Sequence, residues 1–359
     1  MRSQNVKILN EWVAEIVKWH FSESSGSKFW LNKAKELSFN PLKDIKCYDD
    51  LRSFPDYSDE LRNVPVEDLI PAGFIKNGVI PDIYESGGAT GKPKRIIEVE
   101  TRLKGIEWIN SVLCQHDFPQ GNECGAWLFI GPTGPHIVGR SMGRLAKLRG
   151  SVCFFIDFDP RWVRKCIKNG QTEMANTYVG HIIDEVRDIL CNQNVGVVFA
   201  TPTILERLVN DVQLLEIMKR KVQGLIWSGT SFSPESIRFL QEDVLDKAKI
   251  VGLYGNTLMG IAGQRPTKKG AQYPVVFHSF FPYSITEVVD FKDSTKQVNY
   301  GETGQVKITL LTKEMFIPNN LERDEAKRIA PVDEFFTWDG VSEVRPATGV
   351  KGAIIEGVY

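Results

Sequence analysis

Short apolar runs alternate with helix-length segments over residues 101–257, and this alternation constrains the fold more than any other feature of the sequence. The apolar runs have strand length and are rich in β-branched and aromatic residues. The predicted strands are Ala126–Ile130, Val152–Ile156, Val195–Ala200, Gly224–Ser228 and Lys249–Tyr254. The predicted helices are Thr101–His116, His181–Cys191, Pro202–Val209 and one that begins at Ser233. Such alternation predicts an α/β fold, with helices on the faces of a parallel or mixed sheet.

The segments on either side of this body have a different character. Leu9–His20 carries an apolar helical stripe, Lys28–Leu37 is a second predicted helix, and prolines break Tyr48–Phe74 into short turns. Beyond Met259 the predicted elements are strands, and they indicate a β-rich subdomain such as a small barrel: Phe277–Phe281, Ser284–Val289 and Gly304–Leu311. The predicted division is therefore a lead-in (1–80), an α/β body (81–260), a β-rich subdomain (261–345) and a terminal segment (346–359).

Composition excludes several classes of protein. The 359 residues are 42% hydrophobic and carry a net charge of -1, as in an average globular chain, so attraction to nucleic acid or membrane surfaces is not expected. The N-terminus lacks the apolar core of a signal peptide, and no run is long enough to span a bilayer, so we expect a cytoplasmic protein. No Cys-x-x-Cys pair occurs, and Cys114-Gln115-His116 is more typical of packing than of a metal site.

The loop Ser86-Gly87-Gly88-Ala89-Thr90-Gly91-Lys92-Pro93-Lys94 is typical of an anion cradle. Its glycines let successive backbone N–H groups converge, while hydroxyls and lysines add donors and positive charge. It is not a Walker A motif, because Gly87 and Gly91 are too close and Pro93 follows Lys92 where a Ser or Thr is needed. The flanking segments are predicted strands, so the loop joins two strands. The alternative is a glycine- and lysine-rich hairpin without a ligand.

Small and hydroxyl residues follow three of the predicted strands. They are Ala200-Thr201-Pro202, Ser228-Gly229-Thr230-Ser231 and Tyr254-Gly255-Asn256-Thr257. Ligands of open α/β sheets bind at the carboxyl ends of the strands. These three segments therefore predict a pocket of nucleotide size.

Four segments in order together resemble the acyl-adenylate-forming superfamily, nearest to its phenylacetate-CoA ligase-like branch, over roughly residues 40–345. Ser86–Lys94 resembles the phosphate loop. Gly224–Glu235 resembles the strand and loop that pass the adenine and the acyl substrate. Leu253–Thr257 is similar to the Tyr-Gly-x-Thr-Glu motif, and Thr309–Glu314 followed by Arg323-Asp324 resembles the segment whose aspartate binds ribose.

The resemblance implies that a substrate carboxylate attacks the α-phosphate of ATP, giving acyl-AMP and pyrophosphate. It implies that the β- and γ-phosphates are gripped by Ser86, Gly87, Gly88, Thr90, Gly91 and Lys92. Thr257 would contact the α-phosphate, Tyr254 would stack near the adenine, and Asp324 would bind the ribose hydroxyls. The remaining nucleotide contacts would come from Ser228, Gly229, Thr230, Gly255 and Asn256.

The acid is expected beside His136, which with Lys92 and Thr257 forms the predicted catalytic set. The predicted acid pocket comprises His136, Phe199, Ala200, Trp227, Ser228, Gly229, Tyr254 and Gly255. Without the resemblance, each assignment has an ordinary structural alternative. His136 would be a structural histidine, and Tyr254 would be an aromatic residue at the edge of the core. Leu321–Arg328, which contains Asp324, would be a solvated helix face.

The chain departs from the family pattern at two places. Leu258 replaces the usual glutamate and cannot ligate a hard cation, so Mg²⁺ is expected to be held mainly by phosphates and water, and the predicted protein metal site is none. The sequence also ends at Tyr359, near the expected hinge, so 346–359 is interpreted as a truncated hinge without the family's small C-terminal domain. Lys351 is given no role.

The sequence therefore predicts a ligase that adenylates a carboxylic acid, aromatic rather than long-chain. The aromatic preference rests on the nearest branch and on Phe199, Trp227 and Tyr254. The acyl acceptor is left open among CoA, a carrier-protein thiol and an amine held by a partner enzyme, and the oligomeric state is left open too. One alternative is a non-catalytic protein that binds nucleotide or acyl-adenylate. Another is acyl transfer to a protein cysteine, as in acyl-protein synthetases, which ranks lower because no cysteine follows Cys191.

Overall fold

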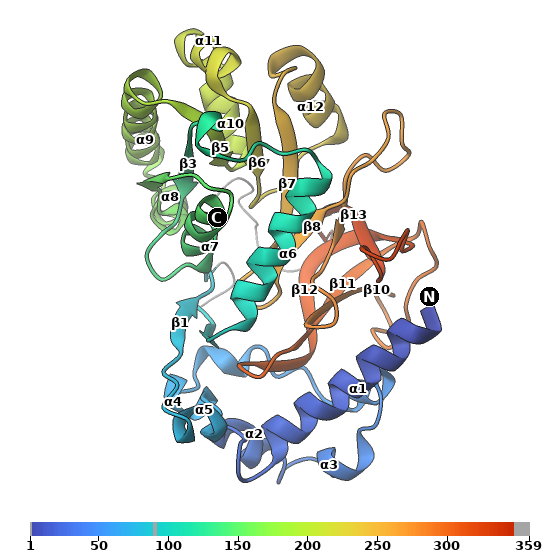
Figure 1. Cartoon of the computed structure of the whole chain (residues 1–359). Helices are drawn as coiled ribbons and strands as arrows, with labels where there is room; N and C mark the ends of the chain where they lie inside the picture. Colours follow the sequence, from blue (N-terminus) through green and yellow to red (C-terminus); the bar gives the residue numbers. More distant parts are fainter. Residues whose placement is uncertain (1, 89–91, 348–359) are drawn as a thin grey trace. The chain divides into compact units, whose positions relative to one another are not determined.

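A computed structural model of the chain describes residues 2–88 and 92–347 (Figure 1). The chain forms two compact units. Within the described residues, unit 1 comprises 2–88, 92–105, 256–261 and 278–347, and unit 2 comprises 106–255 and 262–277. Within the described residues, no helix is long and apolar enough to cross a bilayer.

Unit 2 is built on a sheet whose strand order is β9-β8-β7-β6-β5-β3-β4. Strand β3 pairs in parallel with β4 and β5, and the parallel pairing continues from β5 to β6 and from β6 to β7. The strands are β3 (Ala126–Gly131), β4 (Cys153–Asp157), β5 (Val195–Ala200), β6 (Gly224–Trp227), β7 (Lys249–Asn256), β8 (Gly260–Gln264) and β9 (Val276–His278). Every side chain of β3, β5 and β6 is buried, because both faces of the sheet are covered. The predicted α/β fold is confirmed.

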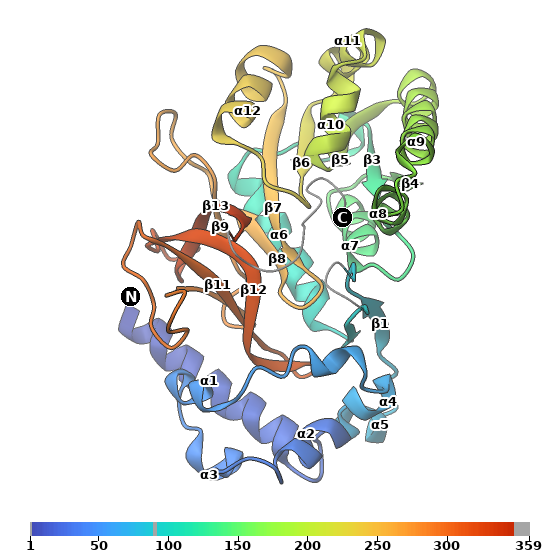
Figure 2. The same cartoon turned by 180° about the vertical axis from the view of Figure 1, so that it is seen from behind.

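Helices cover both faces of the unit 2 sheet. α6 and α7 lie on the face of the sheet that is toward the viewer in Figure 1, and α8 lies on the opposite face, which is toward the viewer in Figure 2. The helices are α6 (Thr101–Gln115), α7 (Ile137–Leu148), α8 (Pro160–Lys168), α9 (Thr172–Asn192), α10 (Pro202–Val209), α11 (Val212–Lys221) and α12 (Pro234–Phe239), followed by a π-helical turn at Leu240–Val244. Thr201 and Ser233 cap α10 and α12, each with a proline in the first turn. The helix starts at Pro202 and Ser233 were predicted, and the Thr201 cap was not.

Unit 1 begins with α1 (Arg2–Phe21) and a series of short helical segments. α2 (Lys28–Lys33) ends before the predicted Leu37. The proline-broken stretch forms α3 (Pro41–Asp44), η1 (Tyr48–Ser53), η2 (Glu60–Arg62), α4 (Val66–Leu69) and α5 (Ala72–Lys76). Aromatic rings hold this region together, with Phe316 lying 5.0 Å from Trp30, 5.3 Å from Phe54 and 5.7 Å from Phe21 between ring centroids.

Unit 1 also contains a hairpin and a four-stranded sheet. The hairpin pairs β1 (Asp82–Glu85) with β2 (Arg95–Glu98). The sheet is antiparallel, in the order β10-β11-β12-β13. Its strands are β10 (Ser284–Val289), β11 (Thr303–Leu311), β12 (Phe316–Ile329) and β13 (Gly340–Pro346). β10 is an edge strand, so the sheet is open and the expected barrel is wrong.

The helical interpretation of Leu321–Arg328 is also wrong, because these residues lie within β12. β12 pairs with β11 on one side and β13 on the other, which satisfies its backbone groups. Two of its charged side chains are buried and paired. Glu325 is 4% exposed and lies 2.7 Å from Arg345, and Arg328 lies 2.6 Å from Asp339. Because these buried charges have partners of opposite charge, the segment can form a strand although its charge pattern is typical of a surface helix.

Candidate functional site

The glycine-rich loop connects β1 and β2 of unit 1, so it joins two strands, as predicted. Its base is closed at Ser86 and Lys94: the Ser86 N–H donates to the Lys94 carbonyl at 2.9 Å, and the Lys94 N–H donates to Ser86 Oγ at 2.8 Å. A hydroxyl can accept this bond and still donate its own proton. Gly88 has φ +63°, a left-handed conformation that favours glycine and turns the backbone of the loop. Thr90 and Gly91 lie outside the described residues.

The two lysines of the loop have different surroundings. Lys94 Nζ donates to Ser58 Oγ at 3.1 Å and lies 3.6 Å from the Asp59 carboxylate, with its side chain 13% exposed. Lys92 is exposed, and its carbonyl accepts a hydrogen bond from the Arg62 guanidinium. Lys94 therefore anchors the base of the loop to the chain at Ser58, whereas Lys92 is the lysine that remains at the surface of the loop.

Thr257 lies against the start of this loop. Its hydroxyl donates to the carbonyl of Glu85, the residue before Ser86, at 3.3 Å. The turn that carries Thr257 is held by Asn256, whose Oδ1 accepts the N–H groups of Leu258 and Met259, each at 2.9 Å. Two motifs that are 172 positions apart in the sequence are thus joined within unit 1.

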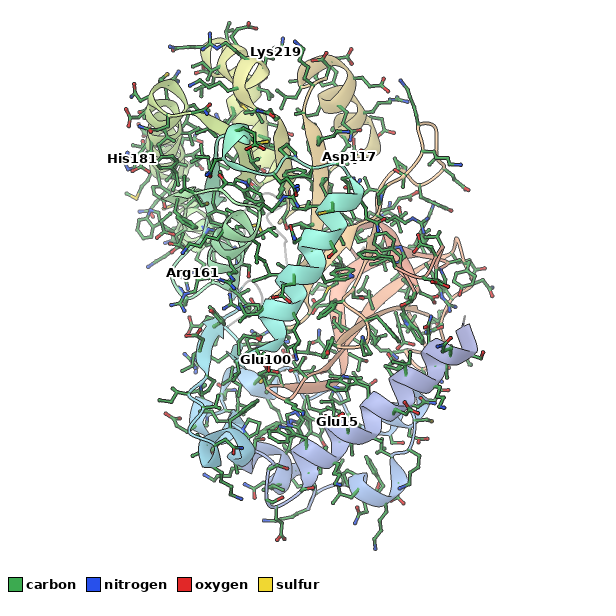
Figure 3. All side chains as sticks on the ribbon, viewed as in Figure 1. Glu15, Glu100, Asp117, Arg161, His181 and Lys219 are labelled. Atoms are coloured by element: carbon green, nitrogen blue, oxygen red, sulfur yellow. The ribbon has the colours of Figure 1, made fainter. Side chains whose placement is uncertain are left out.

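Two carboxylates meet the chain where the hairpin leads into α6. Glu314 Oε1 accepts the N–H groups of Glu100 and Thr101 at 2.8 and 2.9 Å, and its Oε2 accepts the Thr101 hydroxyl at 2.9 Å (Figure 3 labels Glu100 at this end of α6). Glu98 accepts the Arg102 N–H at 2.6 Å. Four donors at this helix start are therefore satisfied by carboxylates, which the helix dipole also favours.

Burial sets the protonation of the two carboxylates in opposite directions. Burial, with the nearby Glu314 charge, raises the pKa of Glu98 to about 7. Burial would also raise the pKa of Glu314, but the hydrogen bonds from Thr101 and Glu100 outweigh it and hold that pKa below its usual value. The pair therefore carries one firm negative charge, on Glu314.

Asp324, the predicted ribose ligand, lies on β12 opposite Pro346 of β13 and is half-buried. The backbone of its neighbour Arg323 accepts the Ala347 N–H at 2.8 Å, which extends the pairing. Asp324 thus lies on a strand and not on a solvated helix face. Its role toward ribose stays a prediction.

Two of the three predicted acid-site aromatics, Trp227 and Tyr254, lie toward the carboxyl ends of strands in unit 2. Ala200, Trp227 and Gly252 lie side by side in register across β5, β6 and β7. Phe277 lies 5.9 Å from Trp227 and 5.8 Å from Tyr254 between ring centroids. Phe199 stacks on Phe129 at 4.8 Å, so its ring belongs to the packed interior of the sheet. We call Trp227, Tyr254, Phe232 and Phe277 the strand-end cluster.

The other predicted residues of unit 2 occupy loops at the same ends of the strands. Ser228, Gly229 and Thr230 follow β6 and are half-buried, and Gly229 has φ +96°, which a side chain would strain. Gly255 lies in the last part of β7 and is exposed. His136 is 7% exposed at the residue that precedes α7. The loop before it is held by Asp157, whose carboxylate accepts the Thr133 N–H at 2.9 Å.

Several residues of these regions were not singled out from the sequence. Gln264 is buried and its Oε1 accepts the Gly252 N–H at 2.6 Å, while its carbonyl lies 2.7 Å from His116 Nε2. Burial, partly offset by this carbonyl contact, lowers the pKa of His116. Arg62 donates a hydrogen bond to the loop at Lys92, and Glu314 accepts hydrogen bonds where the chain leaves the hairpin. No local signal marks these contacts, because each joins segments far apart in the sequence.

The donor set does not favour a metal site built from protein ligands. The described residues contain no group of three or more His, Cys, Asp or Glu side chains that could hold a metal ion. Leu258, where a glutamate was expected from the resemblance, is 4% exposed and offers no oxygen. A magnesium ion bound with a nucleotide would take its ligands from phosphate oxygens and water.

Comparison with known proteins finds similarity in structure only. No protein-family model and no curated protein sequence matches the chain. An open conformation of 2-hydroxyisobutyryl-CoA ligase, in complex with 2-HIB-AMP and CoA, matches with a TM-score of 0.63 at 13% identity, over 95% of this chain and 74% of that one. The same enzyme in its thioesterification state matches with a TM-score of 0.60 at 13% identity, over 96% and 68%.

ATP-bound MatB from Rhodopseudomonas palustris matches at 16% identity with a TM-score of 0.48, over 72% of this chain. The chain corresponds to only 46% of the length of MatB. At these identities the comparisons bear on the fold, and the match to the 2-hydroxyisobutyryl-CoA ligase covers nearly the whole chain. The chain shares its fold with this ligase.

Proposed function

We propose that the protein activates a small carboxylic acid with ATP, forming acyl-AMP and pyrophosphate, and that the acyl group then passes to CoA or another acceptor. The contact between the Thr257 hydroxyl and the Glu85 carbonyl carries this proposal. It joins the loop that would grip the β- and γ-phosphates to the threonine that would contact the α-phosphate. The shared fold with a ligase crystallised with 2-HIB-AMP and CoA supports the same chemistry.

The proposed reaction needs positioning more than proton transfer. A carboxylate must approach a polyphosphate, so two anions have to be held together and their charge balanced. The backbone N–H groups of the glycine-rich loop, the Ser86 hydroxyl and Lys92 would hold the phosphates that leave as pyrophosphate. Mg²⁺ bound to those phosphates supplies further charge neutralisation.

Thr257 would serve the phosphate that is attacked. Its hydroxyl has one proton, which the Glu85 carbonyl accepts across 3.3 Å. That distance is longer than the usual 2.7–2.8 Å for a hydroxyl donor, so the bond is weak. If the hydroxyl donated to an α-phosphate oxygen instead, this weak bond would be replaced by a stronger, charge-assisted one.

We extend the proposal to the acid on the basis of unit 2. The strand-end cluster and His136 would border the acid, and their aromatic character favours an aromatic acid over a long alkyl chain. CoA is the acceptor we favour, because the structural match is to a CoA ligase. A carrier-protein thiol or an amine on a partner enzyme would need the same acyl-AMP.

The test is pyrophosphate release with ATP over a panel of aryl and alkyl acids, with and without CoA. Release that depends on both ATP and one class of acid supports adenylation, and thioester formation with CoA identifies the acceptor. A separate calorimetric titration with ATP distinguishes a failed acid panel from a protein that does not bind nucleotide.

One observation favours a second candidate function. Leu258 is buried and gives no carboxylate to the metal that accompanies ATP in the family pattern. A protein that binds ATP or acyl-adenylate without turnover would retain the loop and tolerate this residue. ATP binding by calorimetry with no pyrophosphate release from any acid would identify it.

A further inference from the structure

The indole of Trp227 occupies a fixed place at the end of β6. Gly252 on the neighbouring strand makes room for it, because a Cβ at Gly252 would lie 2.6 Å from the Trp227 ring. Phe232 and Phe277 contact the ring edge-on at 5.4 and 5.9 Å between centroids. With 4% of the residue exposed, the ring has little freedom to reorient.

The polar atom of this ring is left without a protein acceptor. Trp227 Nε1 is buried and has no hydrogen-bond partner among the described residues. Nearly all buried polar groups in proteins are paired, and leaving one unpaired costs about 1–3 kcal/mol. An exception at the carboxyl end of a parallel sheet, where ligands bind, points to an acceptor that a ligand brings.

Two other tryptophans of the chain show the usual outcome, whereas the buried indole N–H of Trp338, in unit 1, also has no partner among the described residues. The indoles of Trp12 and Trp19 donate to the carbonyls of Leu311 and Lys313, each at 2.8 Å. A Cβ at Gly252 would also lie 3.0 Å from the side-chain oxygen of Gln264. That oxygen already accepts the Gly252 N–H at 2.6 Å and does not pair with the indole.

We propose that the Trp227 indole N–H is a specificity-determining donor, and that the substrate class is aromatic carboxylic acids whose ring system carries a nitrogen or oxygen acceptor. The inference rests on the proposed acid site and deepens it. A site that hydrogen-bonds a polar atom of its substrate discriminates against an analogue lacking that atom, because the buried donor is then left unpaired. An alkyl-substituted ring of the same shape would therefore be a poorer substrate.

The probes are matched acids that differ only in the acceptor. Pyridine-2-, -3- and -4-carboxylates are compared with benzoate, and the three methoxybenzoates with the three ethylbenzoates. Binding is followed by ¹H–¹⁵N spectra of the indole groups, in which the cross-peak missing from Trp227→Phe identifies Trp227. An acceptor-bearing acid is expected to move that indole proton downfield, and its matched hydrocarbon is not.

Turnover gives the second measurement. In the wild-type protein kcat/KM for an acceptor-bearing acid should exceed that of its matched hydrocarbon by about 10- to 100-fold. Trp227→Phe should reduce this ratio to about twofold or less. Trp127→Phe is the matched control, since Trp127 is a buried tryptophan of β3 that packs on Phe118, and it should leave the ratio unchanged.

The outcomes separate the two proposals. An equal ratio in wild type and Trp227→Phe, with acids turned over, overturns the donor role while adenylation stands. A downfield indole shift without pyrophosphate release from any acid supports the donor role and counts against adenylation. The inference is also overturned, without the use of a variant, if in every matched pair the acceptor-bearing acid binds or turns over and the indole proton resonance does not move.

Discussion

The carboxylate of Glu314 caps the first turn of α6 at Thr101, which lies 213 positions earlier in the chain. It accepts both the N–H and the hydroxyl of Thr101, at 2.9 Å each. α6 starts immediately after β2, the second strand of the hairpin that carries the glycine-rich loop. The contact therefore fixes the direction in which the chain leaves the proposed phosphate-binding hairpin.

Replacing Glu314 should destabilise the protein in a pH-dependent way. Glu314→Gln loses charged hydrogen bonds to a helix start, and we expect a loss of about 1.5–3 kcal/mol in the free energy of unfolding at pH 7. The folded-state pKa of Glu314 is depressed, so its contribution is present above the unfolded pKa and is lost as pH falls through the folded pKa. Urea unfolding from pH 7 to pH 3 should show the difference from wild type shrinking.

The control for that series is Glu100→Gln. The Glu100 side chain is exposed and pairs with Lys104, so its loss should change stability by less than about 0.5 kcal/mol. Equal effects of the two substitutions at pH 7 would contradict the role given to Glu314.

Glu98 should show the opposite pH dependence. Its folded-state pKa is raised from 4.5 to about 7, so between these values the folded protein holds a proton that the unfolded chain releases. Stability from this group therefore falls as pH rises from about 4.5 to about 7. Glu98→Gln keeps an acceptor for the Arg102 N–H without the charge, so it should raise the free energy of unfolding by about 1–3 kcal/mol at pH 8 and leave it unchanged at pH 4. Denaturant unfolding at the two pH values checks this, and a gain of equal size at both would refute it.

Lys92 and Lys94 should differ in their effect on ATP. Lys92→Ala removes a loop cation that we assign to the phosphates, and ATP affinity should fall about 10- to 100-fold. Lys94→Ala breaks contacts to Ser58 and Asp59 instead, so it should lower thermal stability more than it lowers ATP affinity. Calorimetric titration with ATP, together with thermal melts, compares the two variants directly. A stronger loss of ATP affinity in Lys94→Ala would reverse the assignment.

Helices and strands that are determined by residues close together in the sequence could be predicted. Pro202, which suits the first turn of a helix, predicted α10 with its observed bounds, and the apolar run at Val195–Ala200 predicted β5. α7 was not predicted, in part because glycines interrupt its pattern. Gly143 lies so close to Phe155 of β4 that a Cβ there would be 2.7 Å from the ring, so close packing of helix on sheet explains the glycine.

Contacts between distant segments could not be predicted from such signals. The charges of β12 pair with partners on other strands and in loops, so a strand resembled a solvated helix face. For the candidate site, the loop was identified from its glycines, hydroxyls and lysines, and the role of Thr257 was implied by the resemblance, but the bond between Thr257 and Glu85 was not predicted. The unpaired indole of Trp227 is likewise visible only in three dimensions, because it depends on Gly252, Phe232 and Phe277 around the ring.

Thr257 gives the most direct test of the proposed chemistry. Thr257→Val keeps the shape of the side chain and removes the hydroxyl that would bind the α-phosphate as charge develops on it. Loss of one such donor costs about 10²–10³-fold in rate in comparable sites, so acid-dependent pyrophosphate exchange should fall by at least about 100-fold. ATP affinity should change much less, because the β- and γ-phosphates would still be held by the loop. Thr257→Ser restores the hydroxyl and should recover most of the rate, which separates loss of the donor from loss of the Thr257–Glu85 contact as packing. Exchange at the wild-type rate in Thr257→Val would remove Thr257 from the mechanism and leave the contact with Glu85 as a structural tie alone.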